Sequence, residues 1–457
     1  MAERCGQAYC SGAAVTRDAT GGCESLPVIT QRDPRGADEF KRVAQYCVVP
    51  PSGGGAGAQR AHSGSDRAGE TGNDMNVDEL LAHLTALQPL LAENAMETER
   101  RRKPVDANIE AIRATQAFRF FVPRRYGGFE LPLGAFVDVG LILAEACAST
   151  AWVTTFCMEH NWMLAHFPQK AQDEIFGAQP YIIAPAAISP NGRAVARDGG
   201  YVLNGRWQWG TGAMHADWVM LAGIVAGSGE MRMFVLPRAD AEIIDTWHVD
   251  GMAGTGSNDM QVRDLFVPGH RSQMVVAMST GRSEGSLLHA SPMYRMPMMP
   301  ILYLAAGVPA VGAARGALRR FVERAPTRVK FGTTTRQSES AETHIRIGHA
   351  QSRLDVAELI CRQVAAETEG WGTRENICTL ADRLRHRMLM VHAVRLARDV
   401  VRDLFEASGA NAHHASEPLQ RIHRDVHTIA AHAVFDGELV AEQAGRVVLN
   451  LPPTVRL

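Results

Sequence analysis

The spacing of hydrophobic and polar residues changes twice along this chain, and each change marks a different kind of structure. From residue 76, leucines recur at three- and four-residue intervals in VDELLAHLTALQPLLAENAMETE, which predicts amphipathic helices. The segment LGAFVDVGLILAEACASTAWVTTFCMEHNWMLAHF is apolar on almost every side, but Asp138, Glu145 and Glu159 interrupt it. It therefore predicts buried helices rather than a membrane span, within an N-terminal helical domain over residues 75–179.

The next part of the chain has short segments rich in Val, Ile and aromatic residues, separated by Gly, Pro, Asp or Asn. They are YIIAPAAI, GGYVLNGRWQW, DWVMLAGIVA, MRMFVLP, EIIDTWHV and MQVRDLFVP. These segments predict a β-domain of six or more strands within residues 180–290. After Met293 the pattern becomes helical again, and four long amphipathic segments predict a four-helix bundle over residues 291–457. The expected fold class is α+β.

Residues 1–74 have a different composition from the rest of the chain. Gly-rich and polar tracts such as PPSGGGAGAQ cannot bury enough apolar surface to offset the entropy lost on ordering. Four of the eight cysteines lie there, without a CxxC pair or a metal-ligand spacing. We expect a disordered extension, or a start codon assigned too early, with Met75 as the natural beginning.

Composition narrows the class of protein. The formal net charge of −2 gives no reason to expect nucleic acid as a partner. We expect no membrane span and no signal peptide, and the scattered cysteines favour a cytoplasmic protein. HExxH is absent, so no metal site is expected. GxxxxGK[ST] is absent, and no GxGxxG lies between a strand and a helix, so a nicotinamide site is not expected either.

The segment GRWQWGTGAMHADWV, from Gly205 to Val219, holds the strongest candidate site. Tryptophans supply stacking area and glycines allow close backbone approach, which suits a flat, redox-active heterocycle. The candidate cofactor-binding residues in it are Trp207, Trp209, Gly210, Thr211 and Gly212. The alternative is structural: tryptophans of a β-core beside a glycine turn.

Four segments together carry a resemblance to a known family. They are PRRYGG at 123–128, the segment from Gly205, GMAGTGSNDMQVRDLFVP at 251–268, and SEPLQRIHRDVHTIAAH at 416–432. In this order they resemble the acyl-CoA dehydrogenase superfamily, most of all the oxygenase components of two-component flavin monooxygenases such as 4-hydroxyphenylacetate and 3-hydroxy-secosteroid hydroxylases. The resemblance implies an N-terminal helical domain, a middle β-barrel-like domain and a C-terminal four-helix bundle, assembled as a homotetramer.

The same resemblance implies a reaction. Reduced FMN or FAD from a separate NAD(P)H:flavin reductase reacts with O2 to a flavin C4a-hydroperoxide, which hydroxylates a small aromatic, phenolic substrate. A neutral histidine can take the phenol's proton near pH 7. An acyl-CoA dehydrogenase-like flavoenzyme is an alternative, although the YEGT-like segment that carries its catalytic carboxylate is missing and Glu406 matches only by residue type. An S- or N-oxygenating relative also stays open.

Individual residues take their expected roles from the resemblance. His432 and His160 are the candidate substrate-contacting histidines, with His427 and His166 as their competitors. Thr211 is expected to hold the hydrogen on flavin N5. Arg295 is the candidate for the flavin phosphate. Arg328 and Arg336 flank Phe331–Gly332 in a turn that resembles the one reaching a neighbouring subunit's cofactor. Each histidine can also be a hydrogen-bonded core residue.

Overall fold

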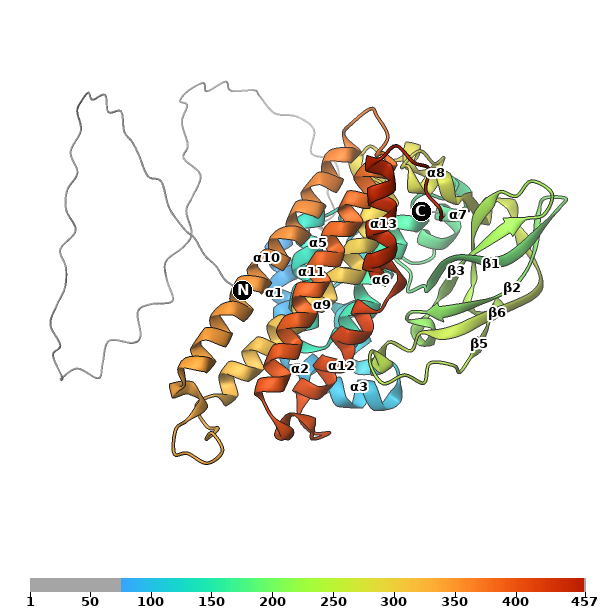
Figure 1. Cartoon of the computed structure of the whole chain (residues 1–457). Coiled ribbons are helices and arrows are strands. Elements are labelled where there is room, and N and C mark those ends of the chain that lie inside the picture. The colour runs from blue at the N-terminus through green and yellow to red at the C-terminus, as the bar shows by residue number, and fades with distance from the viewer. Residues whose placement is uncertain (1–74, 456–457) are drawn as a thin grey trace, which may run out of the picture. The chain divides into compact units, whose positions relative to one another are not determined.

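The computed structural model describes residues 75–455 (Figure 1). The extension expected over residues 1–74 lies outside the described residues. The first helices are α1 (Val77–Ala86), α2 (Gln88–Glu93), α3 (Ala95–Arg101), α4 (Asp106–Ala114), α5 (Leu133–Ala146), α6 (Ala148–Leu164) and α7 (Gln169–Phe176). The leucine-rich segment forms several short helices instead of one long helix, because the backbone turns at Leu87, at Asn94 and at Arg102, which has a positive φ of 53°.

Helix α6 is buried along its whole length, as predicted for this segment, although it includes polar residues such as Thr154, Glu159 and Asn161. The extended backbone of Cys147 separates it from α5. It packs against α5 and α9 on one side, and the segment Ile182–Ala184 lies on another. The side chain of Asn161 fixes that segment, since its Nδ2 donates to Ile182 O at 2.9 Å and its Oδ1 accepts from Ile182 N at 2.9 Å.

The strands form one seven-stranded mixed sheet with the order β5-β6-β2-β1-β3-β4-β7. Their bounds are β1 (Ala186–Arg197), β2 (Gly200–Gly210), β3 (Trp218–Val225), β4 (Met231–Pro237), β5 (Glu242–Ile244), β6 (Asn258–Pro268) and β7 (Ser272–Met274). β1 and β3 are parallel, and the other neighbours are antiparallel. A sheet with β5 and β7 at its edges takes the place of the expected barrel-like domain. It lies beside the long helices (Figure 1).

The C-terminal helices are α8 (Val275–Ser279), α9 (Met298–Arg324), α10 (Ala341–Gly372), α11 (Leu380–Ala407), α12 (Pro418–Ala430) and α13 (Gly437–Val448). The fourth predicted bundle helix is therefore two helices, and His432 lies in the turn between them rather than on a helix. The Asp436 side chain accepts from Leu439 N at 3.1 Å and starts α13. Gly437 packs closely on the Arg395 guanidinium, which would have to move if Gly437 carried a side chain.

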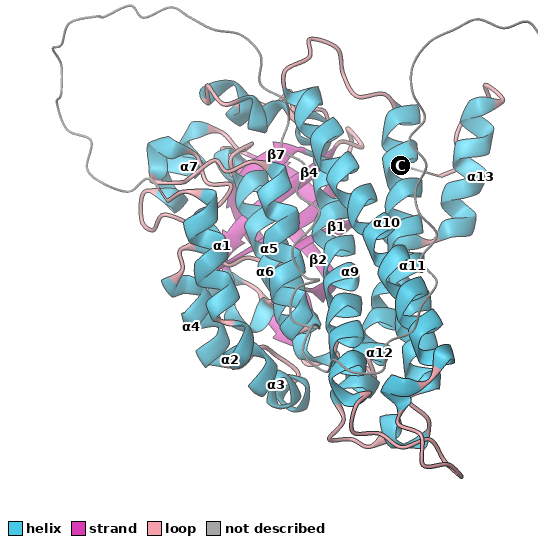
Figure 2. Cartoon of the chain, turned by 90° about the vertical axis from the view of Figure 1, so that its left-hand side faces the viewer, coloured by secondary structure: helices cyan, strands magenta, loops and turns pink. Residues whose placement is uncertain are grey.

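Helix α9 corrects the expectation that no segment is long and apolar enough to cross a membrane. Met298–Arg324 has the length and composition of a span, but 89% of its most apolar window is buried inside the protein. Figure 2 shows α9 between α6 and the pair α10 and α11, and its contacts include α5, α6, α10 and α11. Its apolar surface is thus covered by neighbouring helices, which is typical of a core helix.

Candidate active site

One face of α6 carries a row of buried aromatic and polar side chains. Trp152, Phe156 and His160 follow one another at four-residue spacing and so lie on the same side of the helix. The ring centroids of Trp152 and Phe156 are 4.8 Å apart, and those of Phe156 and His160 are 5.8 Å apart. The continuous row gives the site an apolar wall whose polar groups are the Trp152 indole N–H and the His160 imidazole.

Thr211 follows β2 directly and meets this wall through Trp152. The indole Nε1–H of Trp152 donates to Thr211 Oγ1 at 3.1 Å. Thr211 Oγ1 also lies 3.1 Å from Ser257 Oγ, which lies 2.8 Å from Thr255 Oγ1. Thr255 Oγ1 donates to the Met252 carbonyl oxygen at 2.9 Å. All three hydroxyl groups are buried.

The direction of this hydroxyl chain follows from counting hydrogens. Thr255 uses its single hydroxyl hydrogen on Met252 O, so Ser257 donates to Thr255 and Thr211 donates to Ser257. Thr211 Oγ1 already accepts one hydrogen bond from Trp152. A hydroxyl oxygen has two lone pairs, so Thr211 keeps one acceptor position and has no hydrogen left to donate.

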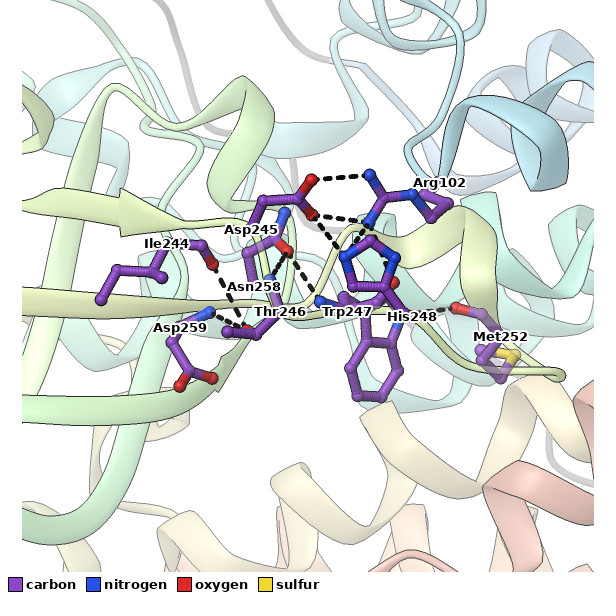
Figure 3. A network of polar contacts seen from close by, with 9 residues as sticks. All are labelled: Arg102, Ile244, Asp245, Thr246, Trp247, His248, Met252, Asn258 and Asp259. Atoms are coloured by element: carbon purple, nitrogen blue, oxygen red, sulfur yellow. Dashed lines mark hydrogen bonds and ion pairs between the residues drawn. The ribbon is translucent and has the colours of Figure 1, made fainter.

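The loop that carries Thr255 and Ser257 is held by the polar network of Figure 3. Asn258 Oδ1 accepts from Thr246 N and Trp247 N at 3.0 Å each, and Trp247 Nε1 donates to Met252 O at 3.0 Å. Arg102 binds the Asp245 carboxylate with two hydrogen bonds of 2.6 and 2.8 Å. The loop formed by GMAGTGSND is thus tied to the segment after β5, which Arg102 at the end of α3 holds in turn, and this fixes where Ser257 can lie.

His432 reaches the same wall from the turn between α12 and α13. Its ring centroid lies 5.6 Å from that of Trp152, in an edge-on arrangement. Its Nδ1 accepts a hydrogen bond from Val434 N at 3.3 Å, so the neutral ring carries its hydrogen on Nε2. Burial lowers the pKa of His432 to about 4, which keeps the ring neutral at pH 7. His432 therefore offers an N–H donor from Nε2.

His160 has the opposite tautomer. Its Nδ1 lies 2.6 Å from Ala184 O, and because a carbonyl can only accept, Nδ1 carries the hydrogen. Nε2 is then a free lone pair. Burial lowers the pKa of His160 to about 4, only partly offset by the bond to Ala184. His160 is thus a neutral acceptor, whereas His432 is a neutral donor.

The two competing histidines lie elsewhere. His427 Nδ1 lies 2.8 Å from His423 O, and its ring packs on the His423 ring at 4.1 Å. His166 is buried at the C-terminal end of α6, where its ring packs on Trp162 and its Nδ1 lies 2.8 Å from Ser283 Oγ. The structure brings together Thr211, His432 and His160 around Trp152 and Phe156, and it does not bring His427 or His166 to them.

A pocket of about 530 Å³ opens next to this group. Trp209 lines it from the sheet, Arg395 and Arg398 line it from α11, and Ala431 and Ala433 line it on either side of His432. Trp209 has a positive φ of 65° and is 58% exposed. An exposed indole beside two guanidinium groups fits a flat heterocycle with a phosphate, because the ring can stack and the cations can pair with the anion.

Three of the residues expected to bind the cofactor, Trp207, Gly210 and Gly212, instead pack against other parts of the protein. Trp207 is fully buried in the sheet core and donates from Nε1 to Ala222 O at 2.7 Å, so the structure supports the β-core alternative for this residue. A side chain at Gly210 would collide with Met260 and Asn258, and one at Gly212, with a φ of 77°, would press on Val153 of α6. The glycines allow the end of β2 to pack closely against β6 and α6.

Arg295, the candidate for the flavin phosphate, and Arg328, from the turn expected to reach a neighbouring subunit, do not line this pocket. Arg295 donates from Nε to Gly372 O at 3.2 Å, at the end of α10. Arg328 donates to Ala407 O at 2.8 Å. The sequence does not single out Arg395 and Arg398, because α11 carries other arginines at one-turn spacing, such as Arg383 and Arg387. Glu406, the possible base of a dehydrogenase, is exposed on α11. Across residues 75–455, no group of three or more His, Cys, Asp or Glu side chains is placed to hold a metal.

The chain is similar to known proteins over most of its described length. Residues 304–437 match the family described as acyl-CoA dehydrogenase, C-terminal domain. The oxygenase subunit HsaA of a flavin-dependent monooxygenase from Rhodococcus jostii is 35% identical over 379 residues, 82% of this chain and 99% of the relative. The oxygenase component of an FADH(2)-dependent resorcinol hydroxylase from a Rhizobium species is 30% identical over 387 residues, 82% of this chain and 95% of the relative. The structure of XiaF from a Streptomyces species in complex with FADH2 and glycerol aligns with a TM-score of 0.78 at 30% identity, covering 83% of this chain and 97% of XiaF.

Proposed function

Because the chain belongs to the acyl-CoA dehydrogenase-like family of oxygenase components of two-component flavin-dependent monooxygenases, we propose that its substrate is a phenol held between His160 and the pocket beside Trp209. Reduced flavin, when bound, supplies the two electrons that let one atom of O2 enter the aromatic ring while the other leaves as water. The meeting of Thr211, His432 and His160 at the Trp152–Phe156 wall carries the proposal.

Each residue has a distinct task in this proposal. Trp209 stacks on the flavin ring, and Arg395 and Arg398 pair with its phosphate. Thr211 Oγ1 accepts a hydrogen bond from flavin N5–H, since that oxygen has an acceptor position and no hydrogen left to give. The apolar wall of Trp152 and Phe156 keeps water away, which limits loss of oxygen as peroxide.

The two histidines divide the proton chemistry. His160 Nε2 accepts the hydrogen of the phenolic hydroxyl, which activates the ring carbon for attack on oxygen. His432 donates from Nε2 to the oxygen that is being transferred. The relative that hydroxylates resorcinol acts on a phenol, which supports a phenolic substrate for this chain as well.

The partners follow from the same family. A separate NAD(P)H:flavin reductase supplies the reduced FMN or FAD, as the names oxygenase subunit and oxygenase component imply for the relatives. We also propose a homotetramer, because Ile345, Val356 and Leu359 of α10 and Phe331 in the loop before it are exposed in the single chain, which suits burial against other subunits. The buried free cysteines Cys147, Cys157, Cys361 and Cys378 are consistent with a reducing, cytoplasmic location.

Thr211→Ala tests the proposed cofactor contact. We expect the variant to bind oxidised FMN as the parent does, because stacking and phosphate pairing are untouched, but to release more hydrogen peroxide per reduced flavin consumed. Thr211→Ser is the matched control, since it keeps the hydroxyl group and should keep most of the coupling. Fluorescence titration measures FMN binding, and peroxide and hydroxylated product are assayed together. Equal coupling in Thr211→Ala and the parent would contradict the contact.

A further inference from the structure

Glu159 is a carboxyl group buried on the face of α6 that forms the site. It lies seven residues after Trp152 and three after Phe156, so the three side chains project from the same side of the helix. Its side chain is fully buried. The sequence gives no sign of this role, because α6 is buried all round and its apolar pattern does not distinguish one face from another.

Neither carboxyl oxygen of Glu159 has a hydrogen-bond partner among the described residues. His160 Nε2 lies 3.3 Å from Glu159 Oε2, but the two groups are not aligned as a hydrogen bond. A buried polar group without a partner destabilises the folded protein. Proteins keep such a group mainly where a ligand or a bound molecule supplies the missing partner.

The protonation states of the pair make it complementary to one hydroxyl group. Burial raises the pKa of Glu159 to about 8, so at pH 7 its carboxyl is a neutral acid with one hydrogen to donate. His160 Nε2 is a lone pair, because the ring hydrogen is on Nδ1 and bound to Ala184 O. Because the donor and the acceptor lie only 3.3 Å apart, a single oxygen beside the pair can form a hydrogen bond with each of them.

We propose that Glu159 and His160 clamp the hydroxyl oxygen of the phenolic substrate, with the Glu159 acid donating to that oxygen while the phenol donates to His160 Nε2. This rests on the proposed function and identifies a second residue that contacts the substrate. The clamp also stabilises the oxygen as its hydrogen moves to His160, since the Glu159 hydrogen bond strengthens when negative charge grows on the oxygen. Substrates without a free aromatic hydroxyl are rejected, because they leave both groups unpaired.

Direct binding of 4-methylphenol tests the clamp without turnover. The full-length protein is saturated with oxidised FMN and titrated with 4-methylphenol at pH 7 by isothermal titration calorimetry. Glu159→Gln keeps the size and an N–H donor, so its dissociation constant should stay within about threefold of the parent. Glu159→Leu removes the donor and should weaken binding by about tenfold or more. Equal affinity of the parent and Glu159→Leu, or equal loss in both variants, would overturn the proposal.

Thermal unfolding of the same variants separates a binding role from a structural one. Because Glu159 has no hydrogen-bond partner within residues 75–455, Glu159→Leu should melt at or above the temperature of the parent. A melting temperature well below the parent's would mean that Glu159 supports the fold, which contradicts the proposal. His160→Gln distinguishes the two ideas: if it does not weaken 4-methylphenol binding, the proposed placement of the phenol fails. If His160→Gln weakens 4-methylphenol binding and Glu159→Leu does not, the proposed placement of the phenol holds and only the role of Glu159 in the clamp fails.

Discussion

His160 and His432 both lie at the aromatic wall, but they present opposite sides of the imidazole to it. A backbone carbonyl holds the hydrogen of His160 on Nδ1, and a backbone N–H holds the lone pair of His432 on Nδ1. Their roles in catalysis therefore follow from the backbone beside them and not from the residue type. The substitutions His160→Ala and His432→Ala should consequently have different effects on the reaction.

His160→Ala should slow hydroxylation by about 10²–10⁴-fold, because the group that takes the phenol's hydrogen is lost. Raising the pH toward 10, the ordinary pKa of a phenol, should restore part of the rate, since the solvent then supplies phenolate. His432→Ala should instead release more peroxide and gain nothing from high pH. His427→Ala is the matched control, because its ring packs on His423. Product formation and peroxide are followed from pH 7 to the highest pH at which the parent is stable. The roles are wrong if high pH rescues His432→Ala and not His160→Ala.

The sequence could predict part of this site and not the rest. Thr211, His160 and His432 stand out as a hydroxyl group between glycines and as histidines in apolar surroundings, and the family resemblance gives them roles. Trp152 and Glu159 give no such signal, because every position of α6 is buried and only tertiary packing decides which side chains meet Thr211. The tautomers likewise depend on which backbone atom the fold places beside each ring, Ala184 O for His160 and Val434 N for His432.

At the scale of elements, Asp425 links α12 to the loop before β6. Its Oδ1 accepts from Met252 N at 2.6 Å, and Met252 O in turn accepts from Thr255, the last hydroxyl of the chain that begins at Thr211. The helices and the sheet are thus connected by a short path of hydrogen bonds that ends in the site.

Asp425→Ala should lower the free energy of unfolding by about 1–3 kcal/mol, because it leaves the buried Met252 N–H without an acceptor. It should also reduce coupling, since the loop that holds Ser257 loosens. Asp425→Asn keeps an acceptor oxygen. Burial raises the pKa of Asp425 to about 6, so its negative charge destabilises the fold as the pH rises through 6, and the Asn variant should match or exceed the parent above that pH. Denaturant unfolding at pH 7.5 measures the free energy of unfolding of both variants. An Ala variant as stable as the Asn variant would exclude the link.

The order of elements was easier to predict than their ends. The change from helical spacing to alternating short strands and back again gave the α+β class correctly. The split between α12 and α13 was missed because residues 419–449 keep a helical apolar pattern on both sides of it.

For the molecule as a whole, buried histidines set the response to acid. Burial lowers the pKa of six histidines in residues 75–455, which are His160, His166, His215, His289, His423 and His432. In the unfolded chain they take up protons near pH 6.5, whereas in the folded chain they stay neutral to a lower pH. Their contribution to stability is therefore complete above pH 6.5 and is lost as the pH falls toward 4.

The melting temperature should accordingly fall steadily between pH 6.5 and pH 4. Glu159 and Asp425 act in the opposite direction, because the folded state favours their protonated forms, but they are two groups against six. His166→Gln should reduce the slope, since burial lowers the pKa of His166 to about 3 and the amide cannot titrate. Differential scanning fluorimetry across this range measures the slope. A melting temperature that is flat or rises toward pH 4 would show that the histidines do not control it.

The turn between α12 and α13 also bears on how such an enzyme can diversify. Inserting one residue in a continuous helix would rotate every later side chain by 100° and disrupt the packing beyond it. Here Ala431 and Ala433 line the pocket from a turn, and α12 and α13 each pack on α11 by their own contacts. A turn can absorb a lengthening or shortening of the chain. Insertions and deletions, as well as substitutions, can therefore change this side of the pocket during evolution without disrupting the helical bundle. The range of aromatic compounds that the enzyme accepts can change in the same way.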